Sequence, residues 1–321
     1  RAMGVKKYVT LCLLFSIVIF VIVRTLYLCD NRVYLVREWP EWAWESSTEP
    51  VPSFRYVRVP RDVCPSSSSA TSLVAGIATS ADHFDQRSAI RETWGGALRE
   101  IGFTVLFLLG ESKGQTLNRR ILEEGAFHRD ILQGEFADTY GNLTYKTVMF
   151  LRWVNEFCSK AKFVLKIDDD VFLNIWDLAE VLRNVSGIKH TMWGHLFRGY
   201  GPNRKNTSKW YVSKESYTQN VYPDFLSGTA YLISADSIPV LAKSTYNLPF
   251  YGLEDVYLTG FIGERTGIRR LNMDGFSITK EPIQPCAIPK VLTSHEWTPR
   301  QLRSAWKNTL SRLNMRLCEG L

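Results

Sequence analysis

Short apolar runs alternate with amphipathic stretches through the middle of the chain. Four runs have the length and the Val, Ile, Leu and Phe content of buried strands, at 73–79, 103–109, 131–133 and 163–167. Three stretches between them have helical patterning, at 82–95, 115–128 and 142–158. Strands that alternate with helices are typical of an α/β fold with a mostly parallel sheet flanked by helices on both faces.

Three consecutive carboxylates interrupt an apolar segment that runs from Phe163 to Leu173. Asp168, Asp169 and Asp170 follow the last predicted strand directly. Adjacent carboxylates repel one another and lose hydration in apolar surroundings, so a cation should compensate them. Mg²⁺ or Mn²⁺ suits this site, because each takes oxygen ligands and bridges carboxylates to phosphates. The alternative is a strand end turned into solvent with hydrated acids.

The N-terminal region has a different pattern. Residues 8–28 are almost wholly apolar, and a membrane span needs about 20 such residues. Bulky residues follow the run, which argues against a cleaved signal peptide. Arg1, Lys6 and Lys7 precede it and favour a cytoplasmic N-terminus. We therefore expect a cytoplasmic tail at 1–7, a transmembrane signal anchor at 8–28, a proline-rich stem at 29–70 and a lumenal domain at 71–321.

Composition narrows the class of protein. With 321 residues, 45% of them hydrophobic, the chain can build one large α/β domain. Its net charge of +7 favours an anionic partner such as a phosphorylated ligand or a membrane surface. No long Lys/Arg run and no nucleic-acid-binding motif occurs, so we do not expect a nucleic-acid partner.

Sequons and cysteines agree with a lumenal body. Three Asn-x-Ser/Thr triplets begin at Asn142, Asn184 and Asn206. Of the six cysteines, Cys12 lies inside the apolar run and Cys29 just beyond it; the other four allow three disulfide pairings among which the sequence does not choose. They are too widely spaced for a zinc site. These four are Cys64, Cys158, Cys286 and Cys318.

Two arginines on the first predicted helix are a candidate anion site. Arg87 and Arg91 are four residues apart and therefore share one helix face. Like charges so placed repel unless they share a partner, and a pyrophosphate would serve, because guanidinium groups pair well with phosphate oxygens. The alternative is that each pairs with a local carboxylate such as Asp85 or Glu92.

Five motifs in order resemble those of the beta-1,3-galactosyltransferase family, which includes Brainiac-type N-acetylhexosamine transferases. The resemblance covers roughly residues 73–299 and implies a GT-A fold, a UDP-sugar donor, Mn²⁺ and a Golgi type II membrane topology. The motifs are Arg87-x-x-Ile90-Arg91-x-Thr93-Trp94-Gly95, Phe107-Leu108-Leu109-Gly110, Asn142-Leu143-Thr144-x-Lys146-Thr147, Lys166-x-Asp168-Asp169-Asp170 and Glu254-Asp255-Val256-Tyr257.

The resemblance also implies roles for individual residues. Asp255 is expected to be the catalytic base, with Glu254 orienting it or the donor sugar. Without the resemblance, this acidic pair would be interpreted as a helix N-terminal cap. The expected metal ligands are Asp170, Asp168 and His295, although a late histidine is nearly as often a surface residue. The expected donor-binding residues are Arg87, Arg91, Lys166, Asp168, Asp169 and Gly228.

The resulting hypothesis is an inverting beta-1,3-glycosyltransferase. It would move galactose or an N-acetylhexosamine from a UDP-sugar to the 3-hydroxyl of an acceptor glycan on a glycoprotein or glycolipid. Trp210, Tyr217 and Tyr222 are candidates for stacking on the acceptor, or else ordinary core or surface aromatics. One alternative is an inactive relative that binds a UDP-sugar or glycan. Another is a secreted calcium- or glycan-binding module, although the Asp168 region lacks an EF-hand continuation.

Overall fold

A computed structural model describes residues 50–60, 63–64, 73–282 and 291–314, with side chains up to 311. The expected cytoplasmic tail and membrane span lie outside these residues, as do Cys286 and Cys318. Within the described ranges, no helix is both long enough and apolar enough to cross a membrane.

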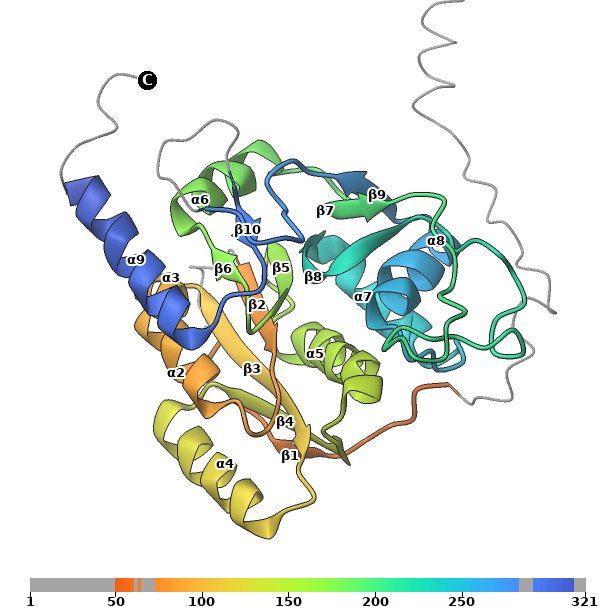
Figure 1. Cartoon of the computed structure of the whole chain (residues 1–321), viewed down its shortest axis with the longest axis horizontal. Helices are drawn as coiled ribbons and strands as arrows, with labels where there is room; N and C mark the ends of the chain where they lie inside the picture. Colours follow the sequence, from red (N-terminus) through yellow and green to blue (C-terminus); the bar gives the residue numbers. More distant parts are fainter. Residues whose placement is uncertain (1–49, 61–62, 65–72, 283–290, 315–321) are drawn as a thin grey trace, which may run out of the picture. The chain divides into compact units, whose positions relative to one another are not determined.

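An eight-stranded mixed sheet forms the centre of the fold (Figure 1). Its strand order is β1-β4-β3-β2-β5-β8-β7-β9. The strands β4, β3, β2 and β5 are mutually parallel, as the alternating pattern predicted, whereas β1 and β8 run antiparallel to their neighbours. The strand bounds are β1 Tyr56–Arg58, β2 Leu73–Ala78, β3 Thr104–Glu111, β4 Ile131–Ala137, β5 Phe163–Asp168, β7 Thr191–Phe197, β8 Phe225–Ser234 and β9 Arg269–Asn272.

Helices cover both faces of this sheet, as the α/β expectation required (Figure 1). Their bounds are α2 Phe84–Glu92, α3 Trp94–Glu100, α4 Gln115–His128, α5 Leu143–Phe157, α6 Ile175–Asn184, α7 Ile238–Ser244, α8 Gly263–Arg265 and α9 Pro299–Asn314. A 3₁₀ turn, η2 (Tyr140–Asn142), precedes α5, and a π-helix, η4 (Val256–Ile262), precedes α8. A small second sheet pairs β6 (Phe172–Leu173) with β10 (Thr293–Ser294).

Alternate residues of the buried strands pack into two separate cores. Val74 of β2 packs in the core that contains α5 and α7, whereas Ala75 packs in the core that contains α2, α3 and α6. Leu106 and Phe107 divide between the two cores in the same way. This arrangement explains why the strands are continuously apolar in sequence, because a parallel sheet covered on both faces buries every side chain.

The first predicted helix is in fact two helices that meet at Thr93. We expected it to stop at Gly95-Gly96, but both glycines lie within α3. A Cβ at Gly96 would lie 2.2 Å from the carbonyl oxygen of Arg91, and one at Gly95 would lie 2.8 Å from that of Ile90. The glycines therefore permit a tight corner between α2 and α3, where we had interpreted them as a helix stop.

The end of the expected stem belongs to the domain. β1 pairs antiparallel with β4 at the sheet edge, and the Val51 side chain is buried. The described residues between 50 and 64 therefore pack with the domain, although we expected the domain to begin at residue 71. A three-residue edge strand among prolines carries no detectable period, which is why the pattern missed it.

A disulfide joins this segment to the end of α5. Cys64 bonds Cys158, which directly follows α5, and so selects the pairing that the sequence left open for these two residues.

Removing this bond is expected to destabilise the fold. The bridge spans 94 residues of sequence, so its loss frees a long loop in the unfolded chain. Cys64→Ser should lower the free energy of unfolding by about 2–4 kcal/mol in urea denaturation. The matched control is the Cys64→Ser/Cys158→Ser double variant, which should lose about the same amount. An unchanged midpoint in both variants would contradict a stabilising role for the bond.

Candidate metal and transfer site

A cluster of three side chains at the carboxyl end of β5 can hold a divalent metal. Asp168, Asp170 and His295 each offer one donor atom, and these atoms lie within 4.8 Å of one another. The His295 Nε2 atom is 3.1 Å from Asp170 Oδ1. We call this set the metal triad. It contains the three ligands that the sequence resemblance implied.

The small β6–β10 sheet brings His295 to the acids. Ser294 pairs with Phe172 in antiparallel register, so the residue after Ser294 lies beside the residues before Phe172. The backbone N–H of Trp297 donates to the Asp170 carbonyl oxygen at 2.8 Å and fixes the same approach. Two short strands therefore assemble the triad from positions far apart in the sequence.

The charges of the triad suit a cation. Burial raises the pKa of Asp168 to about 6, although the neighbouring Lys166 ammonium opposes that rise and Asp170 adds to it. Burial lowers the pKa of His295, but the hydrogen bond to Asp170 and its negative charge outweigh burial and raise the pKa overall. Two carboxylates and an imidazole are a donor set that Mn²⁺ and similar ions accept. The residues present thus fit a divalent metal.

Asp169 lies on the other side of the backbone and has a different set of contacts. Its Oδ2 atom accepts from Thr79 Oγ1 at 2.5 Å and from the ring of His83, whose Nδ1 is 2.8 Å away. The side chain is buried. Successive side chains of an extended chain point to opposite sides, which separates Asp169 from Asp168 and Asp170. The expected role of Asp169 in donor binding stays a prediction, while its observed contacts are with the loop after β2.

Lys166 connects the metal triad to the acidic pair Glu254 and Asp255. Its buried ammonium donates to Asp168 Oδ1 at 2.6 Å and to the Gly228 carbonyl oxygen, and it lies 3.5 Å from Glu254 Oε2. The Gly228 N–H in turn donates to Asp255 Oδ2 at 3.2 Å. A Cβ at Gly228 would lie 3.4 Å from the Asp255 side chain. A short chain of polar contacts thus joins the metal side of the site to Asp255.

The acidic pair is held at the start of η4. Asp255 Oδ1 accepts from the Val256 N–H at 2.8 Å, which is the helix-capping contact that its position predicted. Glu254 is buried and accepts a hydrogen bond from the Tyr231 hydroxyl. Burial raises the pKa of Asp255 to about 6, and the negative charge of Glu254 adds to that rise. A carboxylate whose pKa is raised toward neutral pH is a stronger base and therefore a better proton acceptor.

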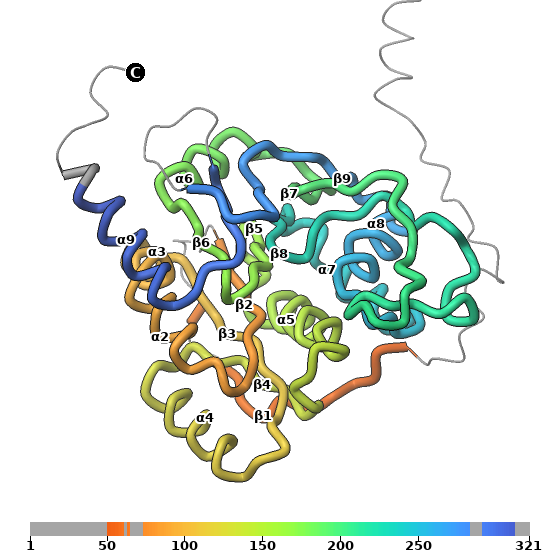
Figure 2. Tube along the Cα trace, viewed as in Figure 1, coloured from red at the N-terminus to blue at the C-terminus, as the bar shows by residue number. Residues whose placement is uncertain are grey.

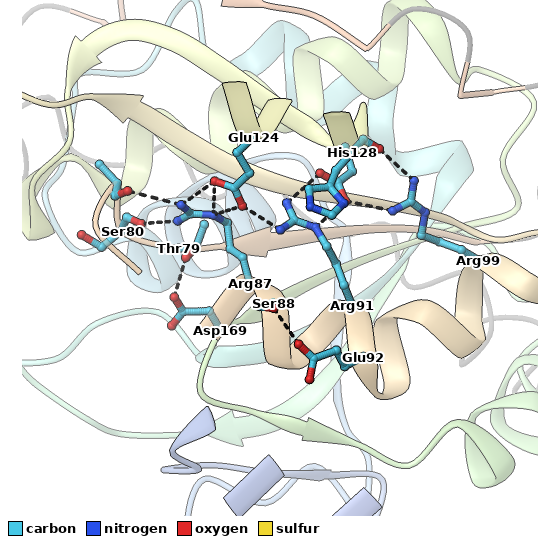
Figure 3. A network of polar contacts seen from close by, with 12 residues as sticks. Thr79, Ser80, Arg87, Ser88, Arg91, Glu92, Arg99, Glu124, His128 and Asp169 are labelled. Carbon is cyan, nitrogen blue, oxygen red and sulfur yellow. Dashed lines mark hydrogen bonds and ion pairs between the residues drawn. The ribbon is translucent and has the colours of Figure 1, made fainter. Parts of the chain in front are cut away.

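Arg87 and Arg91 lie in a network of ion pairs (Figure 3). Arg87 bonds Glu124 through Nε and Nη2 and donates to the carbonyl oxygens of Ser80 and Ala81. Arg91 donates to Glu124 Oε1, which Arg87 also contacts, and to both oxygens of Asp130. The two arginines do share an anionic partner, but it is Glu124 of α4. Asp85 and Glu92, the local carboxylates named in the alternative interpretation, pair with Arg303 of α9.

The contacts of Arg87 differ from those expected of a donor-binding residue. Its side chain is 0% exposed, so a phosphate could reach it only by displacing Glu124. Because it binds the carbonyls of Ser80 and Ala81, it holds the loop that presents Thr79 to Asp169. Arg91 is 11% exposed and remains a predicted donor ligand. A buried carboxylate on the next helix carries no local sequence signal, which is why pairing with Glu124 was not foreseen.

Breaking the Arg87 pair is expected to destabilise the protein strongly. In Arg87→Ala, Glu124 loses one of two cationic partners in a buried position, which typically costs about 3–5 kcal/mol. Urea denaturation followed by circular dichroism would measure the change. The control is Arg55→Ala, which breaks the exposed pair between Arg55 and Glu135 and should leave the midpoint unchanged. Equal effects of the two substitutions would contradict the structural role of Arg87.

Some residues around the site were not selected from the sequence. Thr79 and His83 follow β2, and Tyr140 follows β4, each at the carboxyl end of a parallel strand. Lys146 of α5 is buried and donates to the Thr79 carbonyl oxygen at 2.6 Å and to Asp138 at 2.9 Å. The rule that ligands bind at the carboxyl ends of parallel strands was the available signal for the first three.

The chain is similar in sequence to one protein family and to several characterised transferases. The family profile described as Galactosyltransferase matches residues 85–274. The chain is 37% identical over 248 residues to beta-1,3-galactosyltransferase 1 of Mus musculus and of Homo sapiens, which covers 76% of this chain and 76% of each relative. It is 35% identical over 236 residues to lactosylceramide 1,3-N-acetyl-beta-D-glucosaminyltransferase of Mus musculus, covering 70% of this chain and 62% of that protein.

Proposed function

Because this chain belongs to the galactosyltransferase family of beta-1,3-glycosyltransferases, we propose that it is an inverting beta-1,3-hexosyltransferase. The donor is a UDP-sugar, and the sugar is galactose or an N-acetylhexosamine. The acceptor is the 3-hydroxyl of a glycan on a glycoprotein or glycolipid. The printed names of the relatives support this range, since they include both a galactosyltransferase and an N-acetylglucosaminyltransferase.

One observation carries the proposal. The metal triad lies at the carboxyl end of β5, Asp255 lies at the start of η4, and the two are joined through Lys166 and Gly228. An inverting transfer needs this pairing, because charge must be neutralised on the leaving diphosphate while one base acts on the acceptor side.

Different residues of the chain bind the metal and act as the base. Asp168, Asp170 and His295 would hold Mn²⁺, which as a Lewis acid stabilises the negative charge of the departing UDP. Asp255 accepts the proton of the acceptor 3-hydroxyl as that oxygen bonds the anomeric carbon. The bond between the anomeric carbon and the diphosphate breaks in the same displacement, so the anomeric configuration inverts. The Gly228 and Val256 N–H groups hold the Asp255 carboxylate in place, and the charges of Glu254 and Lys166 set its electrostatic environment.

The cellular setting is part of the proposal. The apolar run at 8–28 supports a single-pass type II anchor in the Golgi membrane, with the catalytic domain in the lumen. The Cys64–Cys158 disulfide supports an oxidising compartment.

A donor panel tests the proposed activity. The protein would be incubated with Mn²⁺ and UDP-galactose, UDP-GlcNAc or UDP-GalNAc, with and without acceptor glycosides, and UDP release and product linkage would be measured. We expect one donor to be used, with a beta-1,3-linked product. Absence of both transfer and hydrolysis with all donors would contradict the proposal and leave an inactive relative.

A further inference from the structure

The structure separates the three aromatic residues that were candidates for stacking on a sugar. Tyr217 and Tyr222 are 1% and 5% exposed, and both pack against Phe261 in the core. Trp210 is 50% exposed. It lies in the irregular segment 198–224 between β7 and β8, which we call the β7–β8 segment and which Figure 2 shows as a long excursion from the sheet. Of the three, Trp210 therefore has a ring available to a ligand.

Trp210 lies close to a second exposed ring, that of Tyr140 in η2. The Lys209 ammonium is 4.7 Å from the centroid of the Trp210 ring and 5.7 Å from that of Tyr140. Tyr140 is likewise 50% exposed. Burial raises the pKa of Tyr140, and a hydrogen bond with Trp210 opposes that rise. Two half-exposed rings from separate elements thus meet around one lysine.

This pair of rings lies beside the turn that carries Asp255. Thr144 Oγ1, just after η2, donates to the Tyr251 carbonyl oxygen at 2.7 Å. A Cβ at Gly252 would lie 3.9 Å from the Gly141 carbonyl oxygen, so η2 and the turn run against each other. Asp255 follows three residues later in the chain. The negative charges of Asp255 and Asp168 both contribute to the raised pKa of Tyr140.

The β7–β8 segment holds Trp210 in a fixed position. The Arg204 guanidinium donates to four carbonyl oxygens, those of Val212, Ser213, Tyr217 and Gln219, at 2.6–3.0 Å. The ends of the segment are joined by a hydrogen bond from the Tyr222 N–H to the Tyr200 carbonyl oxygen, at 2.8 Å. The Tyr222 hydroxyl is 2.7 Å from that of Tyr251, which anchors the segment to the Asp255 turn. Such preorganisation lowers the entropy cost of binding.

We propose that Trp210 and Tyr140 form an acceptor platform, on which the apolar C–H face of a neutral hexopyranose stacks with its reactive hydroxyl toward Asp255. Flat aromatic rings with a polar edge suit such a ligand, because they bury apolar area while their N–H and O–H groups stay hydrogen-bonded. This inference rests on the proposed function and adds to it the residues that select the acceptor.

Substitutions in the platform should weaken binding of the acceptor and leave binding of the donor unchanged. With the methyl glycoside that supports transfer, chosen from β-galactoside, β-N-acetylglucosaminide and β-lactoside, Trp210→Ala and Tyr140→Ala should each raise the acceptor KM by about tenfold, or about 1.4 kcal/mol. The KM of the UDP-sugar and the rate of its hydrolysis should stay within about twofold. Trp210→Phe, which keeps a ring, should recover most of the affinity.

Tyr211→Ala is the matched control. Tyr211 is 44% exposed and adjacent to Trp210, but among the described contacts the Lys209 ammonium lies over the rings of Trp210 and Tyr140 and not over that of Tyr211. Its replacement should leave the acceptor KM unchanged. An unchanged acceptor KM in Trp210→Ala, an equal rise in Tyr211→Ala, or a parallel rise in the donor KM would each overturn the platform.

Saturation-transfer NMR separates this inference from the proposed function. Irradiating aromatic protons of the wild-type protein should transfer magnetisation to the C–H protons of the methyl glycoside, and Trp210→Ala should abolish that transfer. If the wild type moves no sugar but shows this signal, and Trp210→Ala loses it, the proposed function fails and the platform stands. If the wild type is active and Trp210→Ala keeps both signal and KM, the platform fails and the function stands.

Discussion

Asp255→Asn is expected to lower the rate of sugar transfer by about 10²–10⁴-fold, the range that general base catalysis contributes. An asparagine keeps the shape of the side chain, and its single amide oxygen can still accept from one of the two N–H groups, Gly228 or Val256, that bond the two oxygens of Asp255. It cannot take a proton from the acceptor hydroxyl. The loss should therefore appear in kcat, and UDP binding in the presence of Mn²⁺ should stay near the wild-type value.

The control for this variant is thermal unfolding. Because burial and Glu254 raise the pKa of Asp255, its negative charge destabilises the folded state at neutral pH. Removing that charge offsets the one hydrogen bond that the amide loses, so the melting temperature should change little. Near-normal transfer by a folded Asp255→Asn protein would contradict the base role, as would loss of UDP binding.

The pH dependence of the wild-type rate offers a separate check. The base form of Asp255 is populated above its pKa of about 6 and lost below it. We expect kcat to fall as the pH drops through about 6 and to level off above it. A rate that is independent of pH between 5 and 7 would contradict the assignment. Initial rates at saturating donor and acceptor would measure this profile.

Asp170→Ala is expected to remove metal dependence together with activity. Asp170 supplies one of two carboxylates of the metal triad and is its link to His295, at 3.1 Å. A metal ion contributes several kcal/mol to stabilising charge in the transition state, so the rate should fall by at least about 10²-fold. Titration of Mn²⁺ followed by electron paramagnetic resonance should show weaker metal binding, which is a readout independent of activity.

The neighbouring Asp169 provides the matched control. Asp169→Asn also removes a carboxylate from the same run but leaves the metal triad intact, and its oxygen can still accept from Thr79. It should retain Mn²⁺ binding within a few-fold of the wild type. Full activity of the wild type in excess EDTA would refute a metal mechanism, and equal loss of Mn²⁺ binding in both variants would refute the division between Asp170 and Asp169.

The sequence determined the layered α/β fold, its buried strands and most of its helices. Strands such as 163–168 are apolar throughout because both faces of a parallel sheet are covered, and that pattern is local. The helix at Gln115–His128 was predicted with its observed bounds, because it lies between a glycine and a strand with a continuous amphipathic period. The acids at the end of β5 and the Glu254-Asp255 pair were likewise found from local pattern and motif order. Here the sequence was sufficient because each feature depends on neighbours within a few residues.

Only the tertiary structure decided which groups meet. His295 joins Asp168 and Asp170 because the β6–β10 pairing closes a long stretch of chain. Arg87 forms a buried ion pair because α4 places Glu124 beside it. Trp210 lies near Tyr140 in a β7–β8 segment that the hydrogen bonds of Arg204 hold in place. These contacts join residues distant in sequence, and their energies depend on burial and on the partner opposite. A local pattern of polar and apolar positions gives neither the burial of a side chain nor the identity of its partner.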